Sequence, residues 1–224
     1  MKKVIVISAH PDDEVLGAGG TILKHSAQGD QVFWLITTNI TEPDGFTVEM
    51  VSERQEEIKE VEKILGIQKT YLLNYPTMKL DSRIVNEMVP RISEIFKEVE
   101  PEIIYCLNRS DAHSDHRYTF DAVMSCTKSF RYSYLKQVLL YECISETEFA
   151  PALPEKVFLP NYYVDISNFI EKKLEAMNIY ASELGEHPFP RSERNIKALA
   201  TYRGAIAGVE YAEAFQLIKF IDKE

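Results

Sequence analysis

Short runs of apolar, often β-branched residues alternate along this chain with longer segments whose apolar residues recur at helical spacing. Such alternation is typical of βα units, in which helices cover both faces of a mainly parallel sheet. The strands that we predict, the last two from weaker patterns, span residues 4–7, 32–37, 70–73, 103–107, 138–141, 162–166 and 215–221. We therefore expect an α/β fold with a mostly parallel sheet and helices on both faces.

The segments between these runs carry helix signals of different strength. Ser52 and Gln55 form a capping box ahead of an apolar stripe that ends at Gly66, which predicts a helix beginning at Ser52. A helix over residues 82–99 contains Pro90, which is expected to kink or split it. Further helices are predicted near residues 16–28, 118–130, 167–184 and 192–205.

The net negative charge and the spacing of the cysteines limit the partners and the cellular compartment that we expect for this protein. Lys and Arg number 25 against 35 Asp and Glu, a net charge of −10 that predicts neither a nucleic-acid nor a membrane partner. No segment approaches the roughly 18 consecutive apolar residues that span a bilayer. Cys106, Cys126 and Cys143 show no CxxC spacing, so we expect reduced, mostly buried thiols in a cytoplasmic protein. Because the chain contains no linker-like segment, we expect one domain over residues 1–224.

Two polar clusters directly follow predicted buried strands. The first is the run Ala-His-Pro-Asp-Asp-Glu at residues 9–14, and the second covers residues 108–117, with two histidines and two aspartates. In open α/β sheets, ligands bind beyond the carboxyl ends of the strands. If the first and fourth strands are near neighbours, both clusters meet over one edge of the sheet.

The side chains of these clusters match the donors of a catalytic zinc site. Such a site uses three protein ligands, with nitrogen or oxygen donors at about 2.0 to 2.2 Å, and leaves the fourth position to water. We predict that His10, Asp13 and His116 are these ligands. Asp12 is then placed to accept the proton of the bound water, and His113 to face the substrate oxygen. Fe²⁺, Co²⁺ or Ni²⁺ can occupy the same donors.

Each of these residues also has a purely structural interpretation. A single histidine after a strand is usually a capping or hydrogen-bonding group, and Asp12 or Asp13 alone more often caps the helix that follows. The combination favours a metal site, because three of the five histidines lie in the two clusters, each near more than one carboxylate. Helix capping alone does not require so many histidines and carboxylates in two short segments.

Two other features have competing interpretations. The glycines at positions 17, 19 and 20 lack the spacing of a phosphate-binding loop, so we expect them to allow close packing at the start of a helix. Arg54 and Glu57 are either a surface i,i+3 pair of little energetic worth or a clamp for an anion or a carbonyl group.

The motifs resemble those of the LmbE-like, or PIG-L, family of N-acetylglucosaminyl deacetylases. The resemblance rests on residues 9–14 with the Gly-Gly-Thr run at 19–21 behind them, and on the His-Ser-Asp-His element at 113–116. It extends through residues 54–57 and towards residues 210–215, so it covers most of the chain.

The resemblance implies a zinc-dependent hydrolase on a Rossmann-like sheet that removes the acetyl group from an N-acetylated amino sugar or a related conjugate. Its partner is therefore a small-molecule sugar substrate. Carried over to this chain, the family's metal ligands are His10, Asp13 and His116, and its general base is Asp12.

The second motif implies further roles. His113, in its protonated form, stabilises the oxyanion, and Asp115 holds the His113 ring in orientation. Arg54 matches an arginine that contacts the substrate. Either Asp12 or His113 protonates the leaving amine.

Two other functions stay open. One is an amidase that acts on a larger thiol or peptide-like conjugate, which measurement of free acetate would separate from a deacetylase. The other is a non-catalytic sugar- or nucleotide-binding domain, which the presence of the non-ligand Asp12 disfavours. The sequence leaves the identity of the sugar and the formation of a homo-oligomer open.

Overall fold

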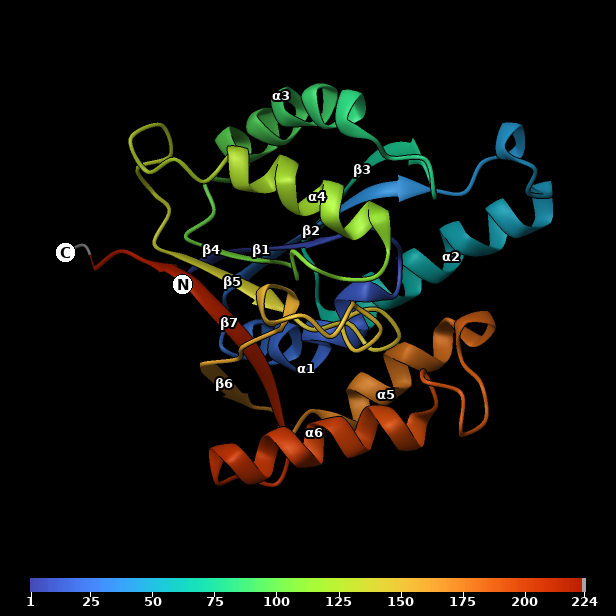
Figure 1. Ribbon diagram of the computed structural model, residues 1–224, viewed down its shortest axis with the longest axis vertical. Coiled ribbons are helices and arrows are strands. Elements are labelled where there is room, and N and C mark those ends of the chain that lie inside the picture. The colour runs from blue at the N-terminus through green and yellow to red at the C-terminus, as the bar shows by residue number, and fades with distance from the viewer. Residues whose placement is uncertain (223–224) are drawn as a thin grey trace.

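The computed structural model describes residues 1–222 and shows a sheet between two layers of helices (Figure 1). Its strands are β1 (Lys3–Ser8), β2 (Gln31–Asn39), β3 (Lys69–Pro76), β4 (Ile103–Leu107), β5 (Gln137–Tyr141), β6 (Tyr162–Asp165) and β7 (Ala212–Phe220). Its α-helices within this range are α1 (Asp13–Ala27), α2 (Val48–Leu65), α3 (Ser82–Val99), α4 (Ser114–Ser125), α5 (Ile170–Ile179) and α6 (Glu193–Ala207). The predicted α/β fold is confirmed.

The seven strands form one sheet in the order β3-β2-β1-β4-β5-β7-β6. β1 pairs in parallel with both β2 and β4, and β7 lies antiparallel between β5 and β6. The first and fourth strands are therefore neighbours, which was the condition for the two polar clusters to meet. The direction of winding reverses between β1 and β4, and ligands bind at such a switch point in open α/β sheets.

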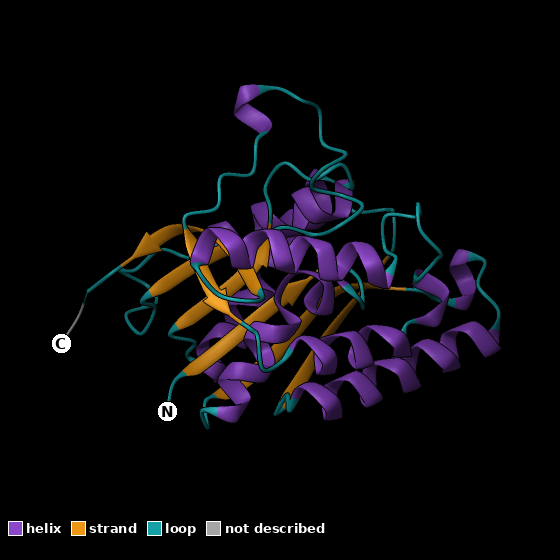
Figure 2. Cartoon of the chain, turned by 90° about the horizontal axis from the view of Figure 1, so that it is seen from below, coloured by secondary structure: helices purple, strands orange, loops and turns teal. Residues whose placement is uncertain are grey.

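Side chains alternate across the sheet and separate two hydrophobic cores. In β1, Val4 and Val6 belong to one core while Ile5 and Ile7 belong to the other. The helices α1, α2, α5 and α6 cover the first core, and α3 and α4 cover the second (Figures 1 and 2). Within the described residues, no helix combines the length and hydrophobicity needed to cross a bilayer.

Two helices, α2 and α3, differ from their predictions. α2 begins at Val48 instead of Ser52, because the side chain of Thr47 accepts the N–H of Met50 and caps the helix one turn earlier. Both Val48 and Met50 are exposed, so no apolar stripe marked this turn. α3 runs through Pro90 as one helix, which excludes the split and leaves the kink as the other predicted outcome. Its buried stripe of Met88, Ile92, Phe96 and Val99 holds both halves against the sheet.

The glycines of α1 allow the close packing that was predicted. A Cβ atom at Gly17 would overlap the ring of Tyr141, which is fully buried and donates its hydroxyl to the Ile7 carbonyl at 2.8 Å. We expect Gly17→Ala to lower the free energy of unfolding by about 1 to 3 kcal/mol, the usual cost of overpacking a core. Denaturant unfolding measures this change.

Gly19→Ala is the matched control for Gly17→Ala. Its added methyl group would meet the Lys173 side chain at no less than 3.3 Å, and alanine favours a helix over glycine. If both variants unfolded at the same denaturant concentration, close packing against Tyr141 would not explain the glycine.

Candidate metal centre and active site

Asp12 connects β1 to α1 in a strained backbone conformation. Its φ of 137° lies in a region that residues other than glycine rarely adopt. It occupies the N-cap position of α1, yet its side chain makes no capping hydrogen bond, so the capping interpretation is wrong for Asp12. Its N–H instead donates to Oε2 of Glu14 at 3.1 Å, and the Tyr180 hydroxyl donates to Oε1 of Glu14 at 3.0 Å. The Asp12 carboxylate is buried and available for another role.

Asp13 lies between the two histidines that were predicted as its fellow ligands. Its Oδ2 accepts the N–H groups of Ala9 at 2.9 Å and His10 at 2.8 Å, which fixes the carboxylate over the end of β1. The same oxygen lies 3.7 Å from Nδ1 of His10, and Oδ1 lies 3.2 Å from Nε2 of His116. Asp13 therefore lies between the two imidazoles and presents one oxygen to each, although His116 is more than 100 positions away from the other two residues in the sequence.

Each of these histidines has a carboxylate at its other ring nitrogen. Nε2 of His10 lies 3.1 Å from Oδ2 of Asp115, and Nδ1 of His116 lies 2.9 Å from Oδ2 of Asp111. Metal-binding histidines are commonly oriented by such a carboxylate, which fixes the tautomer and increases the basicity of the ligand nitrogen. This arrangement leaves Nδ1 of His10 and Nε2 of His116 directed at Asp13.

The electrostatics of this cluster favour a positive charge. Burial alone would lower the pKa of His116, but Asp13 and Asp111 hold it well above its ordinary value. Burial alone would raise the pKa of Asp13, but His116 and His10 hold it below its usual range. The buried carboxylates of Asp13 and Asp111 thus favour a positive charge beside them.

His113 faces this cluster as a neutral ring. Burial, together with His10 and His116, lowers its pKa to about 4, so the predicted protonated form is not the one that this environment favours near pH 7. Nδ1 of His113 accepts the backbone N–H of Asp115 at 3.1 Å. The neutral ring therefore carries its proton on Nε2, from which it can donate a hydrogen bond.

The carboxylate of Asp115 is directed at His10 and not at His113, so the predicted role of Asp115 in holding the His113 ring falls to its backbone N–H. The carboxylate contacts His10, as described, and accepts the N–H groups of Met78 at 2.6 Å and Leu80 at 3.2 Å. Only the Asp115 backbone reaches His113. Asp115 therefore orients His10 and ties it to the segment that follows β3.

Arg54 belongs to an ion-pair network above Asp12. Its guanidinium donates to the Pro11 carbonyl at 3.0 Å and to Glu183 at 2.8 Å, and its Nε lies 3.0 Å from Glu57. Glu183 also pairs with Arg191 at 3.1 Å, and Arg191 lies 3.9 Å from the Asp12 carboxylate. The network thus connects α2 to the segment before α6 and closes over the loop that carries Asp12.

The surroundings of Asp12 strengthen it as a base. Burial raises its pKa well above the ordinary value, and the carboxylates of Asp13 and Glu183 raise it further. The positive charge of Arg191 opposes this effect. A carboxylate with a raised pKa accepts a proton more readily than an ordinary one.

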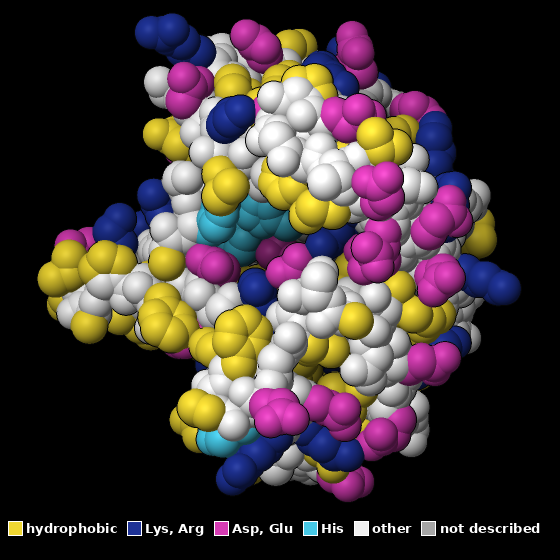
Figure 3. Space-filling model, turned by 90° about the vertical axis from the view of Figure 1, so that its right-hand side faces the viewer, with side chains coloured by type: hydrophobic (Ala, Val, Ile, Leu, Met, Phe, Trp, Pro, Cys, Tyr) yellow, Lys and Arg dark blue, Asp and Glu magenta, His cyan; other side chains and the backbone are white. Residues whose placement is uncertain are grey.

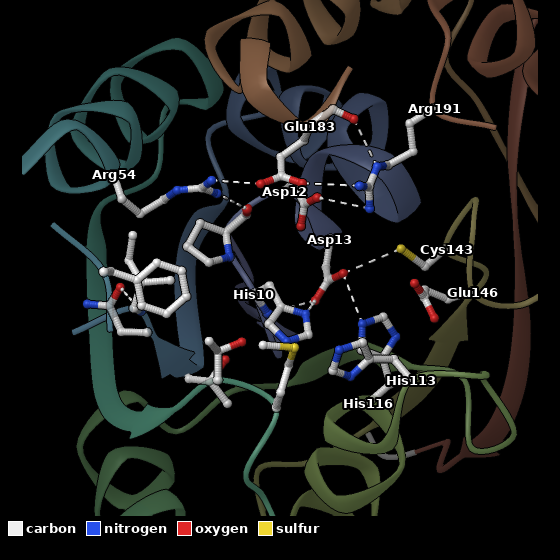
Figure 4. A pocket seen from close by; sticks show the side chains of 17 residues that line it. His10, Asp12, Asp13, Arg54, His113, His116, Cys143, Glu146, Glu183 and Arg191 are labelled. Carbon is white, nitrogen blue, oxygen red and sulfur yellow. Dashed lines mark hydrogen bonds and ion pairs between the residues drawn. The ribbon is translucent and has the colours of Figure 1, made fainter. Parts of the chain in front are cut away.

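The cluster lines a pocket of about 250 Å³. In the space-filling view, histidine side chains lie in a hollow whose rim carries acidic, basic and hydrophobic side chains (Figure 3). Figure 4 shows the labelled side chains entering this pocket from both sides of Asp13. The remaining wall is partly apolar and includes Ile40, Phe46 and Met78.

Among the described residues, two groups of three side chains could each hold a metal ion. Within each group, the three potential ligand atoms lie within 4.8 Å of one another. One group is His10, His113 and His116, and the other is Asp13, His116 and Cys143. The predicted ligands are thus divided between the two groups, with His116 in both. Cys143 was predicted only as a core thiol, whereas its Sγ lies 3.4 Å from Oδ1 of Asp13.

This geometry agrees with the relationship of the chain to known proteins. The sequence model of the PIG-L family, described as GlcNAc-PI de-N-acetylase, matches residues 5–127, more than half of the 224 residues. The chain belongs to the PIG-L family. The resemblance that the two motifs indicated is confirmed, and both motifs fall inside the matched segment.

Three deacetylases resemble the chain over most of its length. Diacetylchitobiose deacetylase of Thermococcus kodakarensis is 29% identical, over 97% of this chain and 84% of the relative. The structure of N,N'-diacetylchitobiose deacetylase from Pyrococcus horikoshii has a TM-score of 0.78 and 27% identity, covering 97% of this chain and 84% of its own. A probable N-acetyl-alpha-D-glucosaminyl L-malate deacetylase 2 of Bacillus anthracis is 24% identical over 81% of each chain.

Several residues of the site were not assigned from the sequence. Asp111 lies in the second cluster and was noted there without a role, and its position five residues before His116 was the available signal. Glu183 and Arg191 lie between α5 and α6, in a segment that contains no motif. Only the fold brings this segment to Asp12. Cys143 lies two residues beyond β5, at the same sheet edge as the clusters.

Proposed function

We propose that this PIG-L family protein is a metal-dependent hydrolase that removes the acetyl group from an N-acetylated amino sugar of the GlcNAc type. The observation that carries the proposal is the position of Asp13 between His10 and His116, with the buried carboxylate of Asp12 in the same pocket. The related deacetylases of diacetylchitobiose and of N-acetylglucosaminyl malate support the choice of substrate.

The donor set fits a catalytic zinc ion. His10, Asp13 and His116 supply two imidazole nitrogens and one carboxylate, which is a three-ligand set that leaves room for water. Asp115 and Asp111 orient the two imidazoles through the ring nitrogens that would not bind the metal. We propose Zn²⁺ as the resident metal, while Fe²⁺, Co²⁺ and Ni²⁺ accept the same donors. When bound, such an ion would polarise the amide carbonyl and lower the pKa of a bound water to about 7.

The chain's own residues perform the proton transfers of the proposed reaction. Asp12 accepts the proton of the attacking water, since its raised pKa and its place beside Asp13 suit a general base. His113 donates a hydrogen bond from Nε2 to the oxygen on which negative charge develops. Asp12 then carries the proton that the leaving amine requires, because neutral His113 has none to give without becoming an anion.

Arg54 has a supporting role in this proposal as well as the predicted contact with substrate. Its guanidinium lines the pocket while it donates to the carbonyl of Pro11, the residue before Asp12. We propose that it holds the Asp12 loop and presents its remaining surface to the sugar. The i,i+3 pair with Glu57 that the spacing suggested is also present, at 3.0 Å.

The wider assignments are also proposals. We propose that residues 1–224 form one LmbE-like deacetylase domain that acts in the cytoplasm, where its three free, buried cysteines would stay reduced. Its partner is a small N-acetylated sugar or sugar conjugate, with neither nucleic acid nor membrane as a partner.

His113→Ala is expected to lower kcat by roughly 10²- to 10³-fold, the usual effect of removing one donor to an oxyanion. Metal content should change little, because His113 is not among the proposed ligands. Steady-state kinetics with metal analysis of the same samples test this. Unaltered kcat would remove His113 from the reaction, and lost metal would make it a ligand.

Release of acetate tests the proposed function directly. The zinc-loaded protein is incubated with N-acetylglucosamine, diacetylchitobiose, UDP-N-acetylglucosamine and simple N-acetylglucosaminides, and acetate and free amine are both measured. We expect equal amounts of the two products from at least one of these compounds. Release of larger acyl groups alone would indicate an amidase, and binding without product would indicate a non-catalytic domain; either result contradicts the proposal.

A further inference from the structure

Cys143 brings a sulfur atom to the far side of Asp13 from His10. Its Sγ lies 3.4 Å from Oδ1 of Asp13, and Nε2 of His116 lies 3.2 Å from the same oxygen. The dashed lines of Figure 4 show both contacts meeting at this oxygen. All three side chains are buried, and Cys143 is 1% exposed. A thiol, an imidazole and a carboxylate therefore face one another in the wall of the pocket.

The separations match those between ligands of one small cation. Tetrahedral zinc with nitrogen and oxygen at about 2.0 to 2.1 Å and sulfur at about 2.3 Å places neighbouring nitrogen and oxygen ligands about 3.4 Å apart, and oxygen and sulfur about 3.6 Å apart. The observed separations of 3.2 Å and 3.4 Å are shorter by only a few tenths of an ångström. Small movements of the side chains would therefore admit an ion.

A hydrogen-bond network holds Cys143 and His116 in this arrangement. The hydroxyl of Thr147 accepts the N–H of Cys143 at 2.8 Å and donates to Oδ1 of Asp111 at 2.7 Å. The other oxygen of Asp111 lies 2.9 Å from Nδ1 of His116. The backbone that carries the sulfur is thus connected to the carboxylate that orients the imidazole, which is the support that metal ligands commonly have.

We propose that Asp13, His116 and Cys143 form a second binding position, for a sulfur-seeking divalent cation such as Cd²⁺ or excess Zn²⁺. The thiolate favours such ions over Mg²⁺, Ca²⁺ or Mn²⁺. On binding, the thiol proton passes to solvent as the metal–sulfur bond forms. The inference rests on the proposed catalytic metal only in that both positions use Asp13 and His116. Because of this sharing, an ion bound through Cys143 competes with the catalytic ion and inhibits hydrolysis.

Cadmium titration of the metal-free, full-length protein tests the sulfur contact. Bonding between thiolate and Cd²⁺ produces a charge-transfer absorption in the ultraviolet, which appears irrespective of any deacetylation. We expect one equivalent of Cd²⁺ to produce this band in the unaltered protein and not in Cys143→Ser or Cys143→Ala. Chelator competition should show Cd²⁺ affinity reduced in these variants by more than the roughly 10- to 100-fold that follows loss of a supporting group.

Cys126→Ser is the matched control for Cys143→Ser. Cys126 is equally buried, but it lies in the other core and donates to the Val89 carbonyl at 3.5 Å. It should keep the band and the affinity. Absence of the band in the unaltered protein, or its persistence in Cys143→Ser, would overturn the inference, and Sγ would then serve only as a hydrogen-bond donor to Asp13. Failure of the acetate assay with the band intact would contradict the proposed function alone.

Discussion

Asp12→Asn is expected to lower kcat by roughly 10²- to 10⁴-fold, the contribution that a positioned general base makes. Asparagine has nearly the same shape as aspartate but cannot accept a proton at neutral pH. The change should not unfold α1, because the Asp12 side chain makes no capping hydrogen bond. Metal content should also persist, since Asp12 is not a proposed ligand. Acetate release with saturating metal measures the effect.

The same substitution at the start of α3 is the control for Asp12→Asn. Asp81 is also an N-cap residue, but it is exposed, and its side chain accepts the N–H groups of Arg83 and Ile84 at 2.9 Å. Asp81→Asn should retain full turnover, because asparagine also caps helices well. Full turnover of Asp12→Asn with saturating metal would show that another group accepts the proton.

His116→Ala is expected to abolish both metal binding and acetate release. His116 is 1% exposed and lies between Asp13 and Asp111, so its removal takes away a proposed ligand and leaves two buried carboxylates without their shared partner. The metal affinity should fall by more than the roughly 10- to 100-fold that follows loss of a supporting group. Metal analysis after gel filtration, with circular dichroism as a check of folding, measures this.

Two further variants show whether lost metal reflects a lost ligand or a lost fold. Asp111→Asn keeps a hydrogen-bond acceptor beside His116 and should weaken metal binding by only about 10- to 100-fold. His25→Ala removes a partly buried histidine from a different site, where it contacts Asp30 at 2.8 Å and Tyr105 at 3.1 Å. Its metal content should equal that of the unaltered protein. Full metal content in folded His116→Ala would exclude His116 as a ligand.

The sequence predicted those parts of the site that depend on strand ends. β1 and β4 are short apolar runs followed at once by polar clusters, and parallel pairing of the two strands brings these clusters together. The strand pattern therefore predicted that Asp13 and His116 belong to one site. The predicted strand at residues 103–107 coincides with β4, because both of its faces are buried and its pattern is unbroken.

The parts that the sequence did not predict depend on side-chain geometry and on distant segments. Whether the Asp115 carboxylate turns to His10 or His113 depends on the N–H groups of Met78 and Leu80, which arrive from the β3 connection. Arg191 reaches Asp12 from 179 positions away through a segment without a motif. Such contacts follow from packing in three dimensions and leave no periodic pattern in the chain.

X-ray diffraction from crystals of the zinc-loaded protein, measured on both sides of the zinc absorption edge, tests the central claim most directly. The claim predicts one anomalous peak in the pocket, with bonds of about 2.0 to 2.2 Å to His10, Asp13 and His116 and a water at the remaining position. A peak that lies elsewhere, or a pocket without a peak in crystals that contain zinc, would contradict it.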